Sequence, residues 1–433
     1  MISLLGRLSK SLLAYEAFKG TLVVEHGEFP SLDDVCLSNP PAPTLSTHPS
    51  SPAIFLAATY ACSDPDQANR ILGGDEFGFA YQRDAHPNGL RLAEKFRLLH
   101  HADQALVTNS GMAALSAIVL HQLRAGDHCL ISRYLYGRSS VLIQQELPKF
   151  GIESTEFDPT DLESVRRNVR RGQTKLLLVE TIANPLLQVA DLPGLVALGR
   201  EYGFQVAVDN TFATPYWCRP LELGVDWVWE SVSKMLNGHS DLMMGMVCGK
   251  DEHWGRIRQM ASTWGLGAAP WDCFLAERGL TTFGLRIERA SQNAGLAARY
   301  LVEHNDVKQV FYPGLPHHPT QANLKSIANT KAASDSPNDV AGNVVSFELD
   351  LQQRSVEQFI ATSGILYFPS LGECSTTLSH PCSSSHRHLS ENQQRALGIS
   401  PGTIRLSFGI EAFDTLREKI RAGLGVSQLT TQK

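Results

Sequence analysis

Short apolar runs alternate with amphipathic stretches through the middle of the chain. The runs have the length of β-strands, and they cover residues 104–108, 128–132, 175–180, 204–209 and 225–231. The stretches between them place apolar residues at helical spacing. Strands that alternate with helices favour an α/β fold, in which a mostly parallel sheet is covered by helices on both faces.

The pattern changes after Gly279. One long helix is predicted from Gly279 to about His304, and the rest of the chain suggests a smaller α+β domain, with strands over 344–351, 366–370 and 403–411 and helices around 355–362 and 414–423. The predicted organisation is an N-terminal arm and linker over 1–50, an α/β domain over 51–300 and a C-terminal α+β domain over 301–433.

The N-terminal arm has two interpretations. Residues 1–20 carry a possible helical stripe of leucines, three basic residues and one acid, and a Pro- and Ser-rich linker follows over 37–52. This start faintly resembles an organelle transit peptide. The preferred interpretation is an arm that packs on a neighbouring subunit or is partly disordered, because amphipathic starts are common.

Composition favours a protein that acts on a small molecule. The chain has 433 residues, of which 43% are hydrophobic and 19% charged, and its net charge is −6 with scattered basic residues. This distribution offers no surface for nucleic acid. The eight cysteines form no Cys-x-x-Cys pair, so we expect reduced thiols, a cytoplasmic location and no metal site. The apolar runs are too short for membrane spans.

Lys234 is the first candidate for chemistry. It follows a predicted strand that ends in Ser231, and Ser233 directly precedes it. A lysine that attacks an aldehyde must be uncharged, and burial or a nearby cation lowers its pKa, while the two hydroxyls could bind a phosphate. An isolated strand-end lysine is more often a surface residue.

Two further segments support a phosphate-bearing cofactor. Asp209 ends the strand over 204–209 at the edge where open α/β sheets bind ligands, and there it could keep a ring nitrogen protonated. Ser110 is placed to cap a helix that Gly126 stops, and amides at a helix start bind phosphate. Taken alone, Asp209 would be interpreted as the cap of a turn and Ser110 only as the cap of a helix.

These segments together resemble one enzyme family. SGMAA (110–114), VDNTF (208–212) and SVSKMLNGHSD (231–241) stand in the same order as in the Cys/Met-metabolism enzymes that depend on pyridoxal phosphate, which include cystathionine γ-lyase, γ-synthase and β-lyase and methionine γ-lyase. The resemblance extends from about Ser51 to the C-terminus, through FAYQRDAHPNG (79–89), RYLYGRS (133–139), ETIANP (180–185), DCFLAERGL (272–280), FPSLGE (368–373) and IRLSFGIE (404–411).

The resemblance implies a fold-type-I enzyme and a role for each matching residue. Lys234 would hold pyridoxal 5'-phosphate as an imine and then move protons, with Tyr136 stacking on the ring and assisting. The other implied cofactor-binding residues are Asp209, Ser110, Gly111, Met112, Thr211, Ser231 and Ser233, together with Tyr81 and Arg83 from the neighbouring subunit. Arg405, Asn184 and Ser370 would bind the substrate carboxylate. An active site shared between subunits implies a homo-oligomer, a dimer or a tetramer.

Some positions depart from the family pattern. The usual Asn-Pro-Thr is replaced by His86-Pro87-Asn88. The usual Ser-Leu-Gly-Gly followed by glutamate is replaced by Ser370-Leu371-Gly372-Glu373-Cys374-Ser375. Ala80 and Pro369 stand where several relatives that handle cystathionine carry acids. Arg138 replaces a small residue, where it either faces an anionic leaving group or turns to solvent or a phosphate.

The predicted reaction is elimination at a carbon–sulfur bond of cystathionine-like or related amino acids, first of all as in cystathionine γ-lyase. The alternatives are γ-replacement, as in cystathionine γ-synthase or an O-acylhomoserine sulfhydrylase, and the β-lyase or methionine γ-lyase reaction. An alternative of another class is a scaffold protein that keeps the fold without catalysis.

Overall fold

The computed structural model describes residues 49–250, 254–328, 341–387 and 389–425. The chain divides into two units after Ala53, and all elements given below belong to the unit that begins at Ile54. The predicted arm over 1–20 and most of the predicted linker over 37–52 lie outside the described residues. Of the helices that the structure describes, none combines the length and the hydrophobicity needed to cross a membrane.

A seven-stranded sheet forms the larger part of this unit. Its strands, in the order in which they pair, are β1 (Gln104–Thr108), β7 (Gly245–Gly249), β6 (Trp227–Ser231), β5 (Gln205–Asp209), β4 (Thr174–Glu180), β2 (His128–Ser132) and β3 (Glu153–Phe157). Only β7 runs against the other six. The five predicted strands and the mostly parallel sheet are confirmed.

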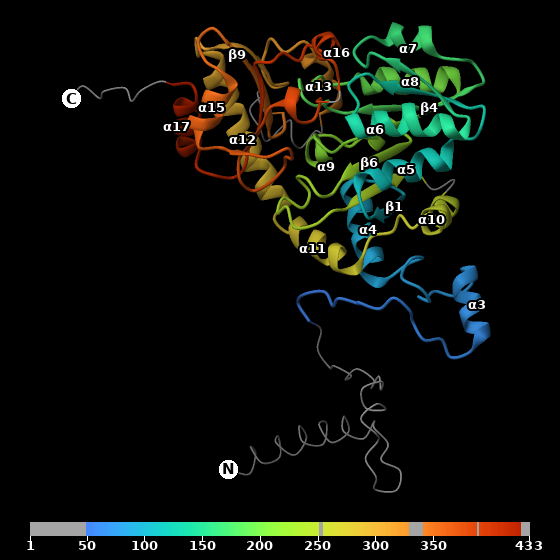
Figure 1. Cartoon of the computed structure of the whole chain (residues 1–433). Coiled ribbons are helices and arrows are strands. Elements are labelled where there is room, and N and C mark those ends of the chain that lie inside the picture. The colour runs from blue at the N-terminus through green and yellow to red at the C-terminus, as the bar shows by residue number, and fades with distance from the viewer. Residues whose placement is uncertain (1–48, 251–253, 329–340, 388, 426–433) are drawn as a thin grey trace, which may run out of the picture. The chain divides into compact units, whose positions relative to one another are not determined.

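Helices cover both faces of this sheet (Figure 1). Side chains along β4 alternate between two cores: Leu177 and Val179 join the first, and Leu176 and Leu178 the second. The first core also takes residues from α4 (Pro87–Leu99), α7 (Leu162–Asn168), α8 (Leu192–Tyr202) and α11 (Pro270–Leu280). The second takes residues from α5 (Gly111–Gln122) and α10 (Trp254–Thr263), and α6 (Gly137–Val141) packs on α5. Burial on both faces explains why these strands read as continuous apolar runs.

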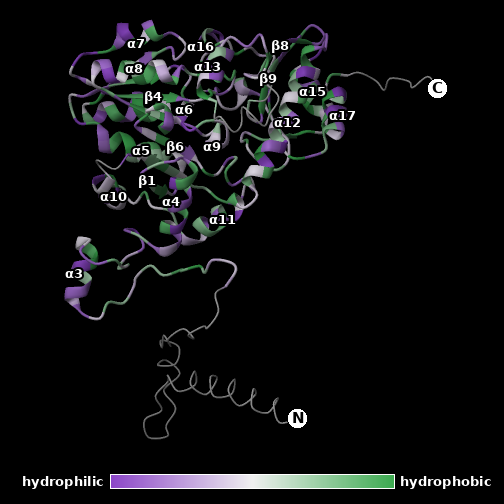
Figure 2. Cartoon of the chain, turned by 180° about the vertical axis from the view of Figure 1, so that it is seen from behind, coloured by the Kyte–Doolittle hydropathy of each residue, from purple (hydrophilic) through white to green (hydrophobic). Residues whose placement is uncertain are grey.

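A smaller C-terminal sheet has its own core. Its strands pair in the order β10 (Leu366–Tyr367), β11 (Thr377–Ser379), β12 (Thr403–Ser407), β9 (Val344–Leu349) and β8 (Val307–Phe311). The helices α12 (Phe283–Val302), α15 (Val356–Ser363) and α17 (Phe413–Gly423) also contribute to this core. In Figure 2 the exposed side of α17 is polar, as expected of a helix that buries one face.

The remaining elements are short. They are α3 (Pro65–Gly73), α9 (Thr214–Trp217), α13 (Gln321–Ile327) and α16 (Glu391–Ala396), with single turns over Leu142–Glu146, Leu147–Phe150, Pro220–Leu223 and Pro381–Ser383.

The predicted start of the long helix was wrong. Gly279 belongs to the end of α11, and α12 begins only at Phe283. The guanidinium of Arg286 lies at this junction and donates to the carbonyl of Gly279 at 2.9 Å. A buried cation at the end of α11 satisfies a carbonyl that an uninterrupted helix would have used internally.

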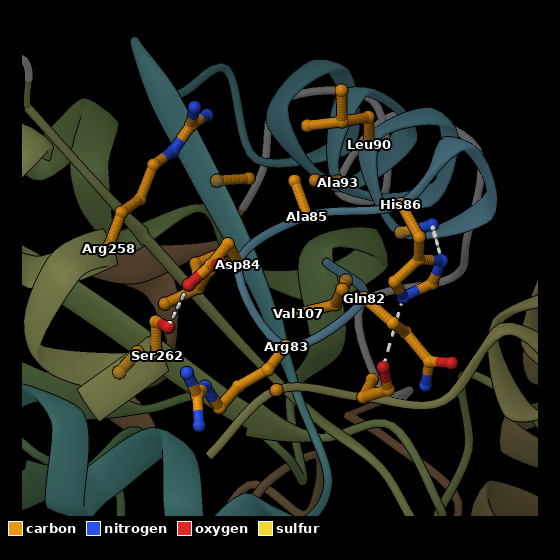
Figure 3. Close-up of a pocket in the computed structure, with 16 residues that line it drawn as sticks. Gln82, Arg83, Asp84, Ala85, His86, Leu90, Ala93, Val107, Arg258 and Ser262 are labelled. Atoms are coloured by element: carbon orange, nitrogen blue, oxygen red, sulfur yellow. Dashed lines mark hydrogen bonds between the residues drawn. The ribbon is translucent and has the colours of Figure 1, made fainter. Parts of the chain in front are cut away.

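The unusual His86 caps the start of α4 (Figure 3). Its Nδ1 accepts the amide of Gly89 at 3.1 Å, and its Nε2 lies 3.0 Å from the carbonyl of Ala268. Because a carbonyl only accepts, Nε2 carries the proton. A histidine in this tautomer accepts a hydrogen bond from the first turn of the helix, as an asparagine at the N-cap commonly does. The departure from the family pattern therefore has a local structural explanation.

Removing this cap should lower stability. We expect His86→Ala to reduce the free energy of unfolding by about 2 kcal/mol, because a helix cap and a buried hydrogen bond are lost together. His86→Asn should cost about half as much, since asparagine restores the cap alone. Urea unfolding of both variants measures this, and equal losses for the two would contradict the capping role.

Candidate active site

The carboxyl ends of the parallel strands meet at one edge of the large sheet. Glu180 ends β4, Asp209 ends β5 and Ser231 ends β6. Glu180 and Asp209 are register partners, so their side chains lie next to each other on the same face. Open α/β sheets bind their ligands at this edge.

Lys234 lies at this edge, in the turn that follows β6. Its Nζ donates to the Oγ of Ser370 at 2.7 Å. Burial, and then the nearby guanidinium of Arg405, lowers the pKa of Lys234, while Glu373 opposes this shift. Arg286 donates to the carbonyls of Met235 and Leu236 and so holds the turn just beyond the lysine. The lysine is thus fixed in place, and its uncharged form is favoured.

Asp209 is a buried carboxyl whose hydrogen bonds come from Thr211 and Trp229. Its Oδ1 accepts the amide of Thr211 at 2.9 Å, and the Oγ1 of Thr211 accepts the amide of Ser231 at 2.9 Å. Burial raises the pKa of Asp209 from 3.8 to about 6, and the Thr211 hydrogen bonds oppose this rise. A carboxylate in such surroundings gains from a cationic ligand that compensates for its desolvation.

The start of α5 forms another wall. The Oγ of Ser110 accepts the amide of Ala113 at 3.1 Å, so Ser110 is the predicted N-cap. The amides of Gly111 and Met112 precede this bond and have no acceptor within the helix, which leaves them for an anion. A Cβ on Gly111 would come within 3.1 Å of the Ser231 Cβ, so glycine lets the helix start approach β6.

Ser233 is already engaged by the backbone. Its Oγ accepts the amide of Met244 at 2.9 Å and lies 3.3 Å from the carbonyl of the same residue. Its predicted contact with a phosphate stays a prediction.

Arg405 is a buried cation that makes two side-chain hydrogen bonds. It lies in β12 and is 3% exposed. It donates to the Oδ1 of Asn184 at 2.9 Å and to the carbonyl of Ser370 at 3.0 Å, both neutral acceptors. Its Nε has no partner among the residues that the structure describes. Burial lowers the pKa of Arg405 to about 10. A buried guanidinium that meets only neutral oxygens suits an anionic ligand.

One cavity of about 520 Å³ joins these groups. Twelve of the predicted site residues line it: Ser110, Gly111, Met112, Tyr136, Asn184, Asp209, Thr211, Ser231, Ser233, Lys234, Ser370 and Arg405. The structure therefore brings them together, although their individual roles remain predictions.

Tyr81 and Arg83 do not line this cavity. The guanidinium of Arg83 lies 5.1 Å from the centre of the Tyr81 ring, and Arg83 lines a separate small cavity beside Asp84 and Ser262 (Figure 3). A reach into the active site of a neighbouring subunit, as the resemblance implies, stays a prediction.

Sequence reasoning missed two acids in the cavity. Glu180 accepts the amide of Tyr136 at 2.6 Å and that of Asn184 at 3.3 Å, and so links the loop of the predicted ring-stacking residue to a partner of Arg405. Burial and the neighbouring Asp209 raise its pKa. Its place at the end of a predicted strand, like that of Asp209, was the available signal. Glu373 also lines the cavity; it ends the FPSLGE motif, but the resemblance gave it no role.

Comparison with known proteins now decides the family. The sequence pattern of the family described as "Cys/Met metabolism PLP-dependent enzyme" matches residues 36–425. The chain belongs to this family. It is therefore an enzyme that depends on pyridoxal 5'-phosphate, one of the family's carbon–sulfur lyases and γ-replacement transferases.

Relatives with several different reactions are similar to the chain. A cystathionine beta-lyase of Bacillus subtilis (strain 168) is 36% identical over 353 residues, which cover 81% of this chain and 87% of the relative. An O-succinylhomoserine sulfhydrylase of Pseudomonas aeruginosa is 31% identical, over 86% of this chain and 90% of the relative. The crystal structure of a cystathionine gamma synthase of Xanthomonas oryzae pv. oryzae, in complex with cystathionine, has a TM-score of 0.79 and 30% identity, and the match covers 87% of this chain and 92% of that one. The fold-type-I architecture is thus confirmed.

The cavity fits the family's cofactor. Pyridoxal phosphate carries an aldehyde, a basic ring nitrogen and a phosphate, and the wall offers a lysine whose pKa is lowered, a buried carboxyl and the unpaired amides of a helix start. These three groups come from β5, the turn after β6 and the start of α5, which meet at one sheet edge. Arg405, which lines the same cavity and donates its hydrogen bonds to neutral oxygens, suits the anionic end of an amino acid.

Proposed function

We propose that the enzyme breaks the bond between the γ-carbon of an amino acid and its substituent, first of all by elimination. The observation that supports this proposal is a chain of hydrogen bonds in the cavity. Lys234 donates to the hydroxyl of Ser370, and Arg405 donates to the carbonyl of the same serine. A substrate whose carboxylate binds Arg405 would thus be held next to the amine of Lys234.

The residues would divide the work as follows. Lys234 would bind the cofactor and, once displaced by the substrate amine, take the proton from the α-carbon with its uncharged Nζ. Asp209 would hold the ring nitrogen protonated, and Tyr136 would pack on the ring. Pyridoxal phosphate, when bound, supplies an electron sink. Ser110, Gly111, Met112, Thr211, Ser231 and Ser233 would bind it near its phosphate or ring, with Tyr81 and Arg83 from a second subunit.

Asn184 and Ser370 would position the carboxylate with Arg405. Asn184 accepts from Arg405 and is itself held through Glu180, so the arginine keeps a fixed direction. Because a guanidinium donates as a planar fork, we expect it to bind the carboxylate through two parallel hydrogen bonds.

Arg405→Lys tests this role. The lysine keeps the charge but loses the fork, so we expect KM for the amino acid to rise about 30-fold while kcat falls much less. The matched control is Arg354→Lys, in the same half of the chain, where the arginine binds the carbonyl of Gly423 away from the cavity. Steady-state kinetics measure both, and an unchanged KM in the Arg405 variant would exclude the carboxylate role.

γ-Replacement by a thiol is the second candidate, because a further cavity beside the main one gives room for another reactant. A substrate panel separates the two. Cystathionine, methionine, cysteine and acylated homoserines are offered with and without a thiol, and the keto acid or thioether is identified. Elimination predicts a keto acid from γ-substituted substrates without thiol. A thioether formed only when thiol is present favours replacement, and consumption of cysteine alone would contradict both.

We also propose that the enzyme is a cytoplasmic homotetramer built from dimers that share active sites. The seven cysteines that the structure describes are free thiols, which fits a reducing compartment. Light scattering of the purified protein tests the assembly.

A further inference from the structure

A chain of buried polar side chains lies behind the active-site cavity. Glu230 directly precedes Ser231 in β6, so its side chain points to the face of the sheet opposite Ser231 and the cavity. On that face the Nδ2 of Asn210 donates to the Oε1 of Glu230 at 2.8 Å, and the hydroxyl of Thr181 donates to the Oδ1 of Asn210 at 2.7 Å. All three of these polar residues are fully buried.

His100 approaches the same acid from the end of α4. Its Nε2 lies 3.4 Å from the Oε1 of Glu230, and both side chains are inaccessible to solvent. Burial, and then Arg219, lowers the pKa of His100 to about 3. Burial also raises the pKa of Glu230 well above its usual range; the hydrogen bond from Asn210 opposes this rise and the charge of Asp209 adds to it. Both shifts favour an uncharged pair, which avoids two buried charges.

The chain of side chains is tied to the backbone at Asp209. The amide of Asn210 donates to the carbonyl of Trp229 at 3.0 Å, and the carbonyl of Asp209 accepts the amide of Thr181 at 2.9 Å. Asn210 is therefore held through its backbone and through a side chain that ends on Glu230. Because Asp209 and Asn210 are consecutive, the direction of the Asp209 carboxyl depends on how firmly Asn210 is anchored.

We propose that Glu230 is a positioning residue, which anchors Asn210 through its hydrogen bond and so keeps the Asp209 carboxyl aimed at the ring nitrogen of the cofactor. This inference rests on the proposed pairing of Asp209 with that nitrogen. Glu230 does not line the cavity and acts only through its neighbours. It acts as an uncharged acid, because a negative charge at Glu230 would disfavour the ionised form of Asp209.

Two substitutions of Glu230 test the anchor. Glu230→Met fills the space but accepts no hydrogen bond, so the side-chain amide of Asn210 loses a buried acceptor. We expect the Kd of the cofactor-free protein for pyridoxal 5'-phosphate to rise about tenfold. Glu230→Gln keeps an uncharged acceptor and should recover most of the lost affinity. Fluorescence titration measures both, and an unchanged Kd in the methionine variant, or a glutamine variant that binds as weakly, would overturn the inference.

A double-mutant cycle shows whether Glu230 acts through Asp209. In the Asp209→Asn background, Glu230→Met should change the Kd by less than about twofold, because the carboxylate that it positions is already gone. A tenfold loss in both backgrounds would overturn the inference. If Asp209→Asn alone leaves the Kd unchanged, the pairing with the ring nitrogen fails, and the inference fails with it. The cycle measures cofactor binding, so its result does not depend on which reaction the enzyme catalyses.

His128→Ala is the matched control for a general loss of stability. His128 is buried at the start of β2, away from the carboxyl edge, and its ring nitrogens lie 2.9 Å from the hydroxyls of Thr174 and Thr155. This variant should unfold at lower urea concentration and keep its Kd within about twofold. A tenfold weaker Kd in the control would overturn the positioning role.

A second variant covers the case in which Glu230→Met does not fold. Asn210→Ala breaks the same hydrogen bond from its other partner. It carries the same expectation of an about tenfold higher Kd, again lost in the Asp209→Asn background. An unchanged Kd in this variant would equally overturn the inference.

Discussion

Replacing Lys234 with alanine is expected to abolish turnover and the covalent attachment of the cofactor together. The amine is buried, its pKa is lowered, and it is the group that would both bind the aldehyde and remove the α-proton. Loss of a positioned acid–base alone lowers rates by about a hundred- to ten-thousandfold, and loss of the covalent link adds to it. We therefore expect kcat to fall by at least about a thousandfold.

Two measurements distinguish a chemical role from a structural one. The visible absorbance of a lysine-bound cofactor should vanish in the variant, while its far-ultraviolet circular dichroism should match that of the unsubstituted protein. Lys149→Ala is the control, because Lys149 is exposed and forms a surface ion pair with Glu146. Activity retained by the Lys234 variant on any γ-substituted amino acid would contradict the account.

Asp209→Asn is expected to act in opposite directions on catalysis and on the stability of the apoprotein. The amide cannot compensate a protonated ring nitrogen, so activity should fall by at least about a hundredfold. The apoprotein should nevertheless become more stable at pH 7, because a buried carboxylate without a cationic partner is removed.

The sign of the stability change depends on pH. The pKa of Asp209 rises from 3.8 to about 6 on folding, because the folded protein favours the protonated carboxyl. Below pH 4 the carboxyl is protonated in both states and does not lower the free energy of unfolding. As the pH rises through 6 the carboxyl ionises in the folded protein, and the free energy of unfolding falls. At pH 7 the loss amounts to about 3 kcal/mol. Asparagine cannot ionise and still accepts the amide of Thr211. Urea unfolding of the cofactor-free protein should therefore show a gain of up to about 3 kcal/mol at pH 7 and almost none at pH 4.

A different pH pattern would be informative. An equal gain at both pH values would mean that packing, rather than the charge of Asp209, sets the effect. A lower stability of the variant at pH 7 would contradict the buried, unpaired carboxylate in the apoprotein.

Local patterns predicted much of the large sheet, and tertiary contacts explain what they missed. Five strands were predicted because both of their faces are buried and their apolar runs are continuous. β3 was missed because Glu153–Phe157 is polar at an edge of the sheet. β7 was missed although it is fully buried, and its antiparallel direction follows from its place between β1 and β6, which no local pattern encodes.

Site residues could be predicted from the sequence where they lie at the end of a predicted strand and their chemistry suits a cofactor. Asp209 ends an apolar strand at the edge where such sheets bind ligands, and Lys234 follows another strand beside Ser231 and Ser233, so their chemistry could be proposed from the residues themselves. Glu180 also ends a predicted strand, but its importance depends on its register with Asp209, and that register exists only in the folded sheet.

Residues that meet across the two sheets were beyond local reasoning. Arg405 could be assigned only through the family resemblance, because its neighbours Asn184 and Ser370 come from distant segments. The same holds for Arg138 and Arg387, which the fold brings to the lining of one cavity. Arg138 stood out in the sequence as a departure, and Arg387 carried no signal.

The central claim is that Lys234 is the residue that binds the cofactor. The most direct test is to reduce the cofactor-loaded protein with borohydride, digest it and locate the added pyridoxyl phosphate by mass spectrometry. The account predicts one modified peptide, with the added mass on Lys234. Modification of another lysine, or no covalent adduct in a protein that turns over its substrate, would contradict it.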